Sequence, residues 1–252
     1  MTGQYSVRIA VQHWPDELVA SWLPPELELA PQSVSPAGHH PCNLLFGIER
    51  KVYFNINPLF KFDYHEFGLV IPYTRWKDPR YTYDGPFLFT PIIFVDSKLV
   101  SFGGEVVFGF PKRIAQFDIG DGSYKAADPQ VHTPYVEVEY APLGTKPDEQ
   151  AIVQITDCLQ QPSVSQKKDG RFMGSGFWWN ADTATFTDIE LDGRIIEYLL
   201  PGVATGTTRP LQARGTERFQ DGAAYHMQTT WTLTLPTKDL DKDWSPWNGT
   251  RA

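Results

Sequence analysis

The clearest chemical signal in the chain is a lysine that directly follows an apolar segment. Lys112 comes after a largely apolar run and Pro111, a composition that predicts a lysine leaving a strand beside an apolar environment. Loss of solvation disfavours the charged ammonium group and lowers its pKa. Moving that pKa from ~10.4 to near neutrality needs roughly 4–5 kcal/mol, at about 1.36 kcal/mol per pKa unit. Because a neutral lysine attacks carbonyl carbon, the segment predicts a nucleophilic amine.

Arg113, the next residue, is a second candidate for lowering the pKa of Lys112. A cation at ~6–8 Å adds repulsion of ~2–3 kcal/mol at an effective dielectric constant of about 20. Adjacent residues on an extended chain point to opposite faces, so we expect burial to dominate and Arg113 to be secondary. The alternative is a surface lysine at a strand end, beside a solvated arginine.

Residues 103–115, with the sequence GGEVVFGFPKRIA, resemble the signature of the acetoacetate decarboxylase family. In that family a Gly-Arg-Glu is followed, a few residues later, by an aromatic residue, a proline and two lysines. The resemblance implies that Lys112 is the Schiff-base nucleophile and that Phe110 is the aromatic residue beside it. It also implies that Arg113 replaces the second lysine, which lowers the pKa of the first. Acetoacetate decarboxylase is a known example of a lysine activated in this way.

A second segment, residues 64–72 (YHEFGLVIP), is similar to the family's Tyr-Thr-Glu-Ser-Gly stretch and the Ile-Pro that follows it. This similarity implies that Glu66 is the active-site glutamate, against the alternative of an exposed carboxylate on a strand. Residues 206–209 and 23–29 match further family segments more weakly. Order and spacing agree over most of the chain, but the close match is confined to residues 62–115.

The arginines of the family pattern have no clear counterpart in this chain. Glu105 stands where the family has arginine if the chain is aligned without gaps from Lys112, and one extra residue is needed to match Glu105 to the family's glutamate. The family's N-terminal arginine lies on the strand before the first helix. Arg8 is on the equivalent strand, although the spacing puts that position nearer Tyr5. Arg8 and Glu105 are therefore candidates for substrate binding or pKa tuning.

The resemblance implies a carbon–carbon lyase that decarboxylates a β-keto acid through a Schiff base on Lys112, without a cofactor. One alternative is an aldolase-dehydratase, which condenses a keto acid with an aldehyde through the same imine. Another is a ligand-binding protein on the same scaffold that has no catalytic activity. The family also implies a homo-oligomer, and the aromatic tail near Trp244 and Trp247 is compatible with subunit contacts or with folding back on its own domain.

Composition argues against several other classes of function. The chain has 252 residues and a formal net charge of −8, without the cationic cluster that nucleic-acid binding requires. No stretch approaches the ~18 uninterrupted apolar residues of a membrane span. Cys42 and Cys158 form no disulfide framework and no signal peptide is expected, so we expect a cytoplasmic protein that acts on a small molecule. His39, His40 and Cys42 have no fourth ligand at a defined spacing, so no metal site is predicted.

A β-rich fold must position these residues, because aromatic residues (14%), 21 Pro and 20 Gly favour strands over helices. Pro15, followed by two acidic residues, predicts one helix that Pro24 and Pro25 end. Residues 188–200 fit either a strand or a helix. Strands are expected at 5–12, 42–56, 64–73, 87–107 (with bends), 134–140, 150–156 and 225–235. We expect a single domain over residues 1–252, mainly β (α+β). The resemblance implies an antiparallel β-cone or barrel of the acetoacetate decarboxylase type with a few peripheral helices.

Overall fold

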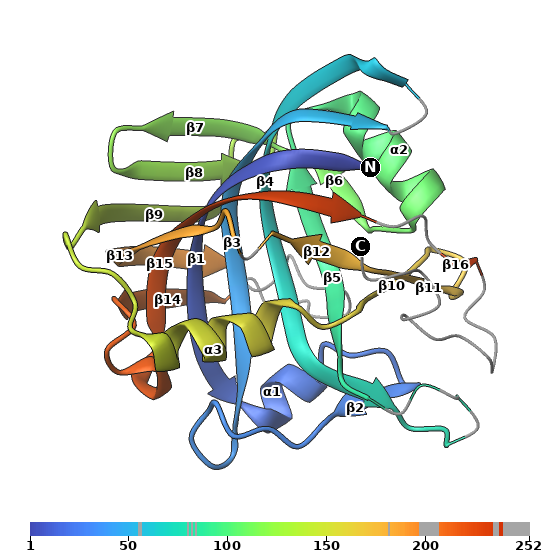
Figure 1. The fold of residues 1–252 in the computed structure, drawn as a ribbon. Coiled ribbons are helices and arrows are strands. Elements are labelled where there is room, and N and C mark those ends of the chain that lie inside the picture. The colour runs from blue at the N-terminus through green and yellow to red at the C-terminus, as the bar shows by residue number, and fades with distance from the viewer. Residues whose placement is uncertain are drawn as a thin grey trace.

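Strands make up most of the chain, and they belong to one mixed sheet (Figure 1). The computed structural model describes residues 1–54, 57–79, 81, 83, 85–180, 182–196, 207–233 and 237–238. The strands are β1 (Thr2–Pro15), β2 (Leu27–Leu29), β3 (His39–Phe54), β4 (Asn57–Trp76), β5 (Phe87–Val95), β6 (Lys112–Ile114), β7 (Gln116–Gly120), β8 (Ser123–Ala127), β9 (Pro134–Pro142), β10 (Ser163–Gln166), β11 (Phe172–Ser175), β12 (Phe177–Trp179), β13 (Thr185–Ile196), β14 (Thr208–Arg214), β15 (Ala223–Leu233) and β16 (Thr237–Lys238). The α-helices are α1 (Asp16–Ala20), α2 (Lys98–Phe108) and α3 (Glu149–Leu159), and Phe219–Asp221 form a 3-10 turn.

The strand order is β16-β11-β10-β5-β4-β3-β1-β15-β13-β9-β8-β7, with β2, β6, β12 and β14 paired beside this path. β5 runs parallel to β6 and to β10, and every other pairing among the described strands is antiparallel. The expected fold class, mainly β with a few helices, is confirmed, but the sheet is mixed and not wholly antiparallel. No helix of the described residues has the length and hydropathy needed to cross a membrane.

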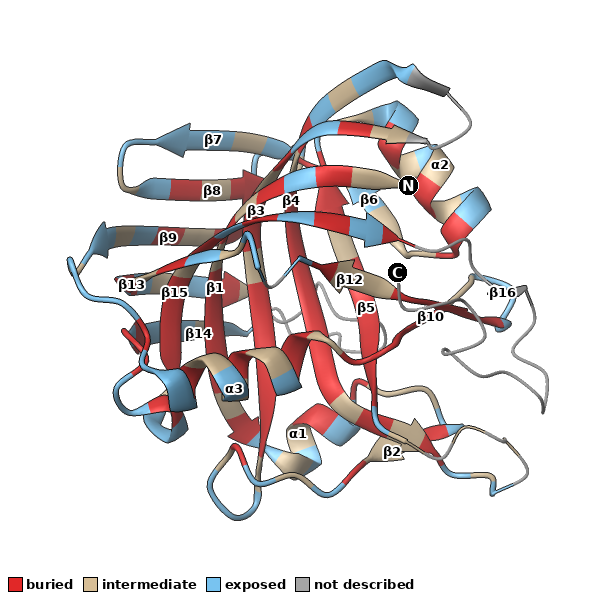
Figure 2. Ribbon diagram, in the orientation of Figure 1, coloured by how far each residue is buried: buried red, intermediate tan, exposed pale blue. Residues whose placement is uncertain are grey.

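The long central strands are buried on both faces (Figure 2). Side chains alternate across a strand, so Val7 and Ile9 of β1 enter one core while Ala10 enters the other. The first of these cores also contains residues of α2 and α3, and we call it the helix-side core. The opposite core contains Leu44 and Phe46 of β3 and many aromatic side chains. The core to which a buried side chain belongs therefore shows which face of its strand that side chain occupies.

Most of the expected elements are confirmed. The strands expected at 5–12, 42–56, 64–73, 134–140 and 225–235 correspond to β1, β3, β4, β9 and β15 within the described residues. The helix expected after Pro15 is α1, although it has only five residues. Residues 188–196 belong to the strand β13, which resolves the ambiguity, and residues 197–200 lie outside the described part. The tail with Trp244 and Trp247 also lies outside it.

Two segments expected to be strands are helical, although the first part of the strand expected at 87–107 is confirmed as β5. Residues 98–107, expected to continue a bent strand, form α2, because the Oγ of Ser97 accepts a hydrogen bond from the Val100 N–H and caps the helix. Gly109 ends α2 in the left-handed conformation at φ +70°. Residues 150–156 belong to α3, which Asp148 caps by accepting from the Ala151 N–H at 2.8 Å. The buried residues of both helices recur at helical spacing, which short apolar runs do not reveal by composition alone.

Truncation of Phe67 is expected to destabilise the fold strongly. Phe67 is 1% exposed in the opposite core and stacks on Phe46 and Phe94, with ring centroids 5.2 and 6.0 Å away. Phe67→Ala removes these contacts and leaves a cavity, so the free energy of unfolding should fall by about 3–5 kcal/mol in urea titrations. Phe102→Ala is the control, because Phe102 is 69% exposed and its loss should cost less than about 0.5 kcal/mol. Equal losses for the two variants would contradict this assignment of the core.

Candidate active site

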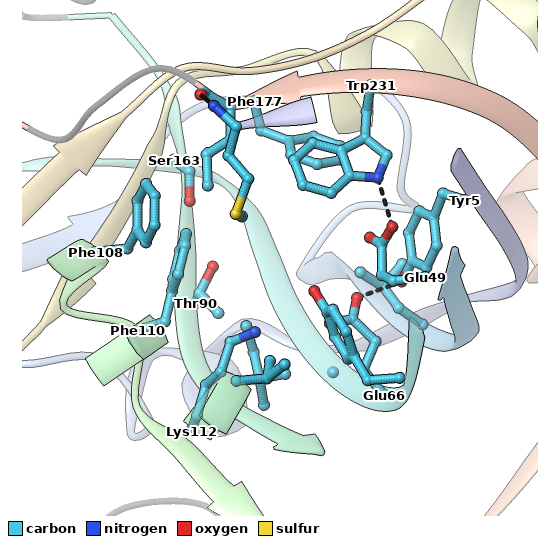
Figure 3. A pocket seen from close by; sticks show the side chains of 18 of the residues that line it. Tyr5, Glu49, Glu66, Thr90, Phe108, Phe110, Lys112, Ser163, Phe177 and Trp231 are labelled. Atoms are coloured by element: carbon cyan, nitrogen blue, oxygen red, sulfur yellow. Dashed lines mark hydrogen bonds between the residues drawn. The ribbon is translucent and has the colours of Figure 1, made fainter. Parts of the chain in front are cut away.

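A cavity of about 260 Å³ opens within the helix-side core (Figure 3). Strands β1, β3, β4, β5 and β15 contribute to its wall together with α2. The wall is mostly apolar and includes Ile9, Leu45, Val70, Val100, Phe108 and Met227. A few polar side chains converge on it, among them Lys112, Glu66, Glu49, Tyr5 and Tyr64. An apolar concavity with a few convergent polar groups is the usual form of a small-molecule site.

Lys112 extends its amine into this cavity (Figure 3). It is the first residue of β6, which pairs in parallel with β5 and sets Lys112 beside Ile93. The sequence predicted a lysine at the end of a strand. In the structure Lys112 instead follows helix α2 and begins the strand β6. Its Nζ lies 5.0 Å from the centroid of the Tyr64 ring. Lys112 is half-buried, because the cavity leaves part of its side chain accessible. Protein atoms nevertheless surround the amine, and this burial lowers its pKa.

Gly104 makes room for the lysine side chain. A Cβ at this position would lie 2.6 Å from Cδ and 2.8 Å from Cε of Lys112. Gly103, the preceding residue of α2, also lines the cavity, but a Cβ there would meet no atom within 4 Å. The absence of a side chain at position 104 is therefore what allows Lys112 to run along α2.

Two buried carboxyl groups share the cavity with Lys112. Glu66 on β4 is opposite Gly47 of β3, and Glu49 of β3 is opposite both Tyr5 and Tyr64. The Tyr5 hydroxyl donates to Oε1 of Glu66 at 2.6 Å, and the indole N–H of Trp231 donates to Oε2 of Glu49 at 2.5 Å. Among the described residues neither carboxylate forms a direct ion pair with Lys112.

Glycines also make room for the two side chains that bind these carboxyl groups. A Cβ at Gly47 would lie 2.3 Å from the ring of Tyr5, and a Cβ at Gly3 would lie 2.9 Å from the indole of Trp231. Tyr5 therefore lies across β3 at Gly47, and Trp231 lies across β1 at Gly3. The rings reach the carboxyl groups because the neighbouring strand carries no side chain at these points.

Burial is the largest influence on the pKa of each shifted group in this cluster. It lowers the pKa of Lys112, and the negative charges of Glu66 and Glu49 act in the opposite direction. Burial and the charge of Glu66 raise the pKa of Glu49 well above its usual value, which favours a protonated Glu49. The pKa values of Tyr5 and Tyr64 are raised by the same two causes, so both hydroxyls keep their protons. The cluster thus combines an amine biased toward its neutral form with several proton donors.

The structure brings some of the expected site residues together. Lys112, Glu66 and Phe110 all line the cavity, and Figure 3 shows Lys112 and Phe110 entering it from the same side. His65 points to the other face of β4 and pairs with Asp96 at 2.8 Å. These positions were accessible from the sequence because all of them lie within the segment that matches the family closely.

Three other expected residues do not line the cavity. Arg113 is exposed, and it is not among the groups that shift the pKa of Lys112, since neighbours on β6 point to opposite faces. Glu105 forms an ion pair with Lys168 at 2.6 Å. Arg8 lies on the face of β1 opposite to Tyr5, and its guanidinium carbon is 4.0 Å from the Tyr140 ring centroid. The alternation of β1 therefore turns Tyr5, and not Arg8, toward the cavity.

Sequence reasoning missed Glu49 and Trp231. Each lies on a strand far in sequence from Lys112 and carries no local motif. Their positions follow from the register of β15, β1 and β3, which pairs Tyr5 with Glu49 and Gly3 with Trp231. Of the weaker family match at 206–209, Gly206 lies outside the described residues.

The described residues contain no group of three His, Cys, Asp or Glu side chains that could hold a metal ion. In the histidine pair considered above, Nε2 of His40 lies 2.7 Å from the carbonyl oxygen of Pro72. His40 is therefore part of a buried contact between β3 and β4.

Known protein structures resemble this one over nearly the whole chain. Acetoacetate decarboxylase from Legionella pneumophila is 17% identical, with 94% of this chain and 84% of that chain aligned and a TM-score of 0.56. The enduracididine biosynthesis enzyme MppR, complexed with pyruvate, is 13% identical, with 96% and 91% aligned and a TM-score of 0.56. An acetoacetate decarboxylase-like enzyme from Sphingomonas wittichii is 11% identical, with 94% and 92% aligned and a TM-score of 0.56.

No protein-family model matches the sequence, and no curated protein matches it. At the identities given above, the structural likeness establishes the fold. The chain has the fold of acetoacetate decarboxylase and the enzymes that resemble it, as the sequence resemblance implied.

Removing the charge of Glu66 is expected to lower the pKa of Lys112 further, because that charge favours the ammonium form. In Glu66→Gln, the pH midpoint for acetylation of Lys112 by acetic anhydride, followed by peptide mass spectrometry, should move toward acid by about one pH unit. Glu105→Gln is the matched control, because its carboxylate pairs with Lys168 outside the cavity. An unchanged or more alkaline midpoint in Glu66→Gln would show that Glu66 does not act on the amine.

Proposed function

We propose that the chain is a carbon–carbon lyase that forms a Schiff base between Lys112 and a keto acid, and that it decarboxylates a β-keto acid. The observation that carries this proposal is the Lys112 amine, which enters an apolar cavity where burial lowers its pKa. A neutral amine is the form that attacks a carbonyl carbon. The likeness of the fold to acetoacetate decarboxylase supports the same reaction class.

The reaction begins when the neutral amine of Lys112 adds to the keto carbon, and loss of water leaves a protonated imine. This iminium group accepts the electron pair that the carbon–carbon bond releases as carbon dioxide leaves. The resulting enamine takes a proton on carbon, and hydrolysis of the imine returns the free amine and releases a ketone. Glu66, which is hydrogen-bonded to Tyr5, is the group proposed to move these protons.

The apolar wall favours loss of carbon dioxide in this scheme. The iminium and the substrate carboxylate carry opposite charges, and both charges disappear as the bond breaks. An apolar wall solvates the starting charges poorly and so lowers the barrier to their cancellation.

An aldolase-dehydratase is the second candidate. The observation that favours it is the hydrogen-bonded pair of Tyr5 and Glu66 beside the amine, which could protonate a leaving hydroxyl group and remove a proton from carbon. MppR, which has the same fold, has been solved with the condensation product of pyruvate and imidazole 4-carboxaldehyde. Both reactions pass through the same iminium on Lys112 and differ in which bond is oriented to break.

Borohydride trapping tests both candidates. Incubation with acetoacetate or pyruvate, followed by reduction, should leave a stable adduct on Lys112 that mass spectrometry maps, and Lys112→Met should give none. Carbon dioxide release from acetoacetate then identifies a decarboxylase, whereas condensation of pyruvate with an aldehyde without gas release identifies the aldolase-dehydratase. Absence of any adduct on Lys112 would contradict both proposed reactions and favour a ligand-binding protein without catalytic activity.

The position of the amine is expected to depend on Gly104. In Gly104→Ala the new methyl group displaces the lysine side chain, so the initial rate of adduct formation should fall by at least about tenfold. Gly103→Ala is the matched control, because it makes the same change one residue earlier in α2 and meets no atom within 4 Å. Circular dichroism should show both variants folded. Equal rates for the two variants would mean that contact with α2 does not position the amine.

A further inference from the structure

The charged side chains of the cavity are gathered around one amine, and the rest of its wall is mainly apolar. Lys112 is the only basic side chain among the described residues that line it, and the N-terminal ammonium of Met1, which also lines it, donates to the carbonyl oxygen of Leu233 at 3.0 Å. The iminium group formed on Lys112 is therefore the one side-chain cation of the described wall that a substrate carboxylate can meet. Leu88, Leu159, Phe177 and Leu233 extend the apolar wall, and Thr90 and Ser163 interrupt it with neutral hydroxyl groups. Everything beyond the reacting end of a substrate would thus contact mainly hydrocarbon.

The cavity is also large for acetoacetate. Its volume of about 260 Å³ corresponds to roughly nine molecules of liquid water at about 30 Å³ each. A four-carbon acid bound at Lys112 would leave apolar wall without a partner. Contacts with that remaining wall are available only to a substrate with additional carbon atoms.

Two of the lining residues mark where the cavity meets solvent. Phe60 of β4 is 54% exposed, and Leu99 of α2 is 58% exposed, although both line the cavity. Figure 1 shows α2 at the same end of the molecule as the end of β3 and the beginning of β4. A substrate chain that begins at Lys112 and runs toward these two side chains therefore passes mainly apolar residues of the wall.

We propose that the substrate is a medium-chain carbonyl compound: a β-keto acid whose keto group lies at Lys112 and whose unbranched apolar chain runs along the cavity toward Phe60 and Leu99. This inference rests on the proposed Schiff-base function for the chemistry. The affinity for the apolar chain of the substrate rests on the apolar wall of the cavity alone. The methyl ketone left after loss of carbon dioxide has the same chain and therefore binds in the same way.

A homologous series of methyl ketones, from 2-butanone to 2-nonanone, tests the proposal by isothermal titration calorimetry. Affinity should rise about fourfold with each added methylene, the ratio that corresponds to about 0.8 kcal/mol per buried CH₂. The rise should stop once the chain reaches the opening. Affinities that stay within about twofold across the series, or that fall with length, would overturn the inference.

Borohydride reduction of the same mixtures separates this inference from the proposed function. A chain-length dependence without an adduct on Lys112 would support the apolar binding site and overturn the Schiff-base function. An adduct that forms equally well with every ketone would support the Schiff-base function and overturn the substrate class. Absence of both binding and adduct would overturn both.

A pair of charge variants on α2 tests the path of the alkyl chain of the bound ketone. Leu99→Asp places a carboxylate at the opening and should weaken binding of 2-nonanone by at least about tenfold, while changing that of 2-butanone by less than about twofold. Phe102→Asp is the matched control, since Phe102 is exposed on the same helix and does not line the cavity. Equal effects of the two variants on 2-nonanone would show that the chain does not pass Leu99.

Discussion

The burial of one amine is the constraint on which the rest of the site depends. An ammonium group enclosed by hydrocarbon is costly, and Lys112 meets this cost in part by becoming easier to deprotonate. The carboxyl groups of Glu66 and Glu49 act against that shift, because their negative charges favour the ammonium form. Glu49 is itself biased toward its protonated form, so the cluster does not hold two full negative charges around one amine. The balance leaves a reactive nitrogen beside groups that can exchange protons.

The sheet builds this cluster from three neighbouring strands. Tyr5, Glu49 and Tyr64 lie side by side on β1, β3 and β4, and Glu66 follows two residues beyond Tyr64 on the same face. Such a row needs correct register in two strand pairs, because a slip of one residue would turn every side chain to the opposite core. Gly47 allows the ring of Tyr5 to cross β3 and reach Glu66. Backbone pairing and the absence of a side chain therefore position the carboxyl groups together.

The cavity is a part of the helix-side core that no side chain fills. Ile9, Val100 and Met227 belong both to that core and to the cavity wall. The packing that holds α2 on the sheet is therefore the packing that encloses Lys112. A substrate with an apolar chain would complete this core, so affinity for the chain and stability of the fold draw on the same hydrophobic contacts.

The sequence by itself indicated the fold class and pointed to Lys112, Phe110 and Glu66, which the structure places on one cavity. These residues were identified because residues 64–72 and 103–115 resemble motifs of the acetoacetate decarboxylase family, and the apolar run and proline before Lys112 point to the same residue. Tertiary structure decided the rest. Residues 98–107 form a helix that buries Val100, Gly104 and Phe108; the cap by Ser97 is local, but this burial is a tertiary contact that the composition of the segment does not reveal. Because side chains alternate along β1, Tyr5 points into the cavity and Arg8 points to the opposite face. Glu49 lies in the site because β3 pairs with β1, a strand distant in sequence. Register and burial are properties of paired strands, so no single segment could reveal them.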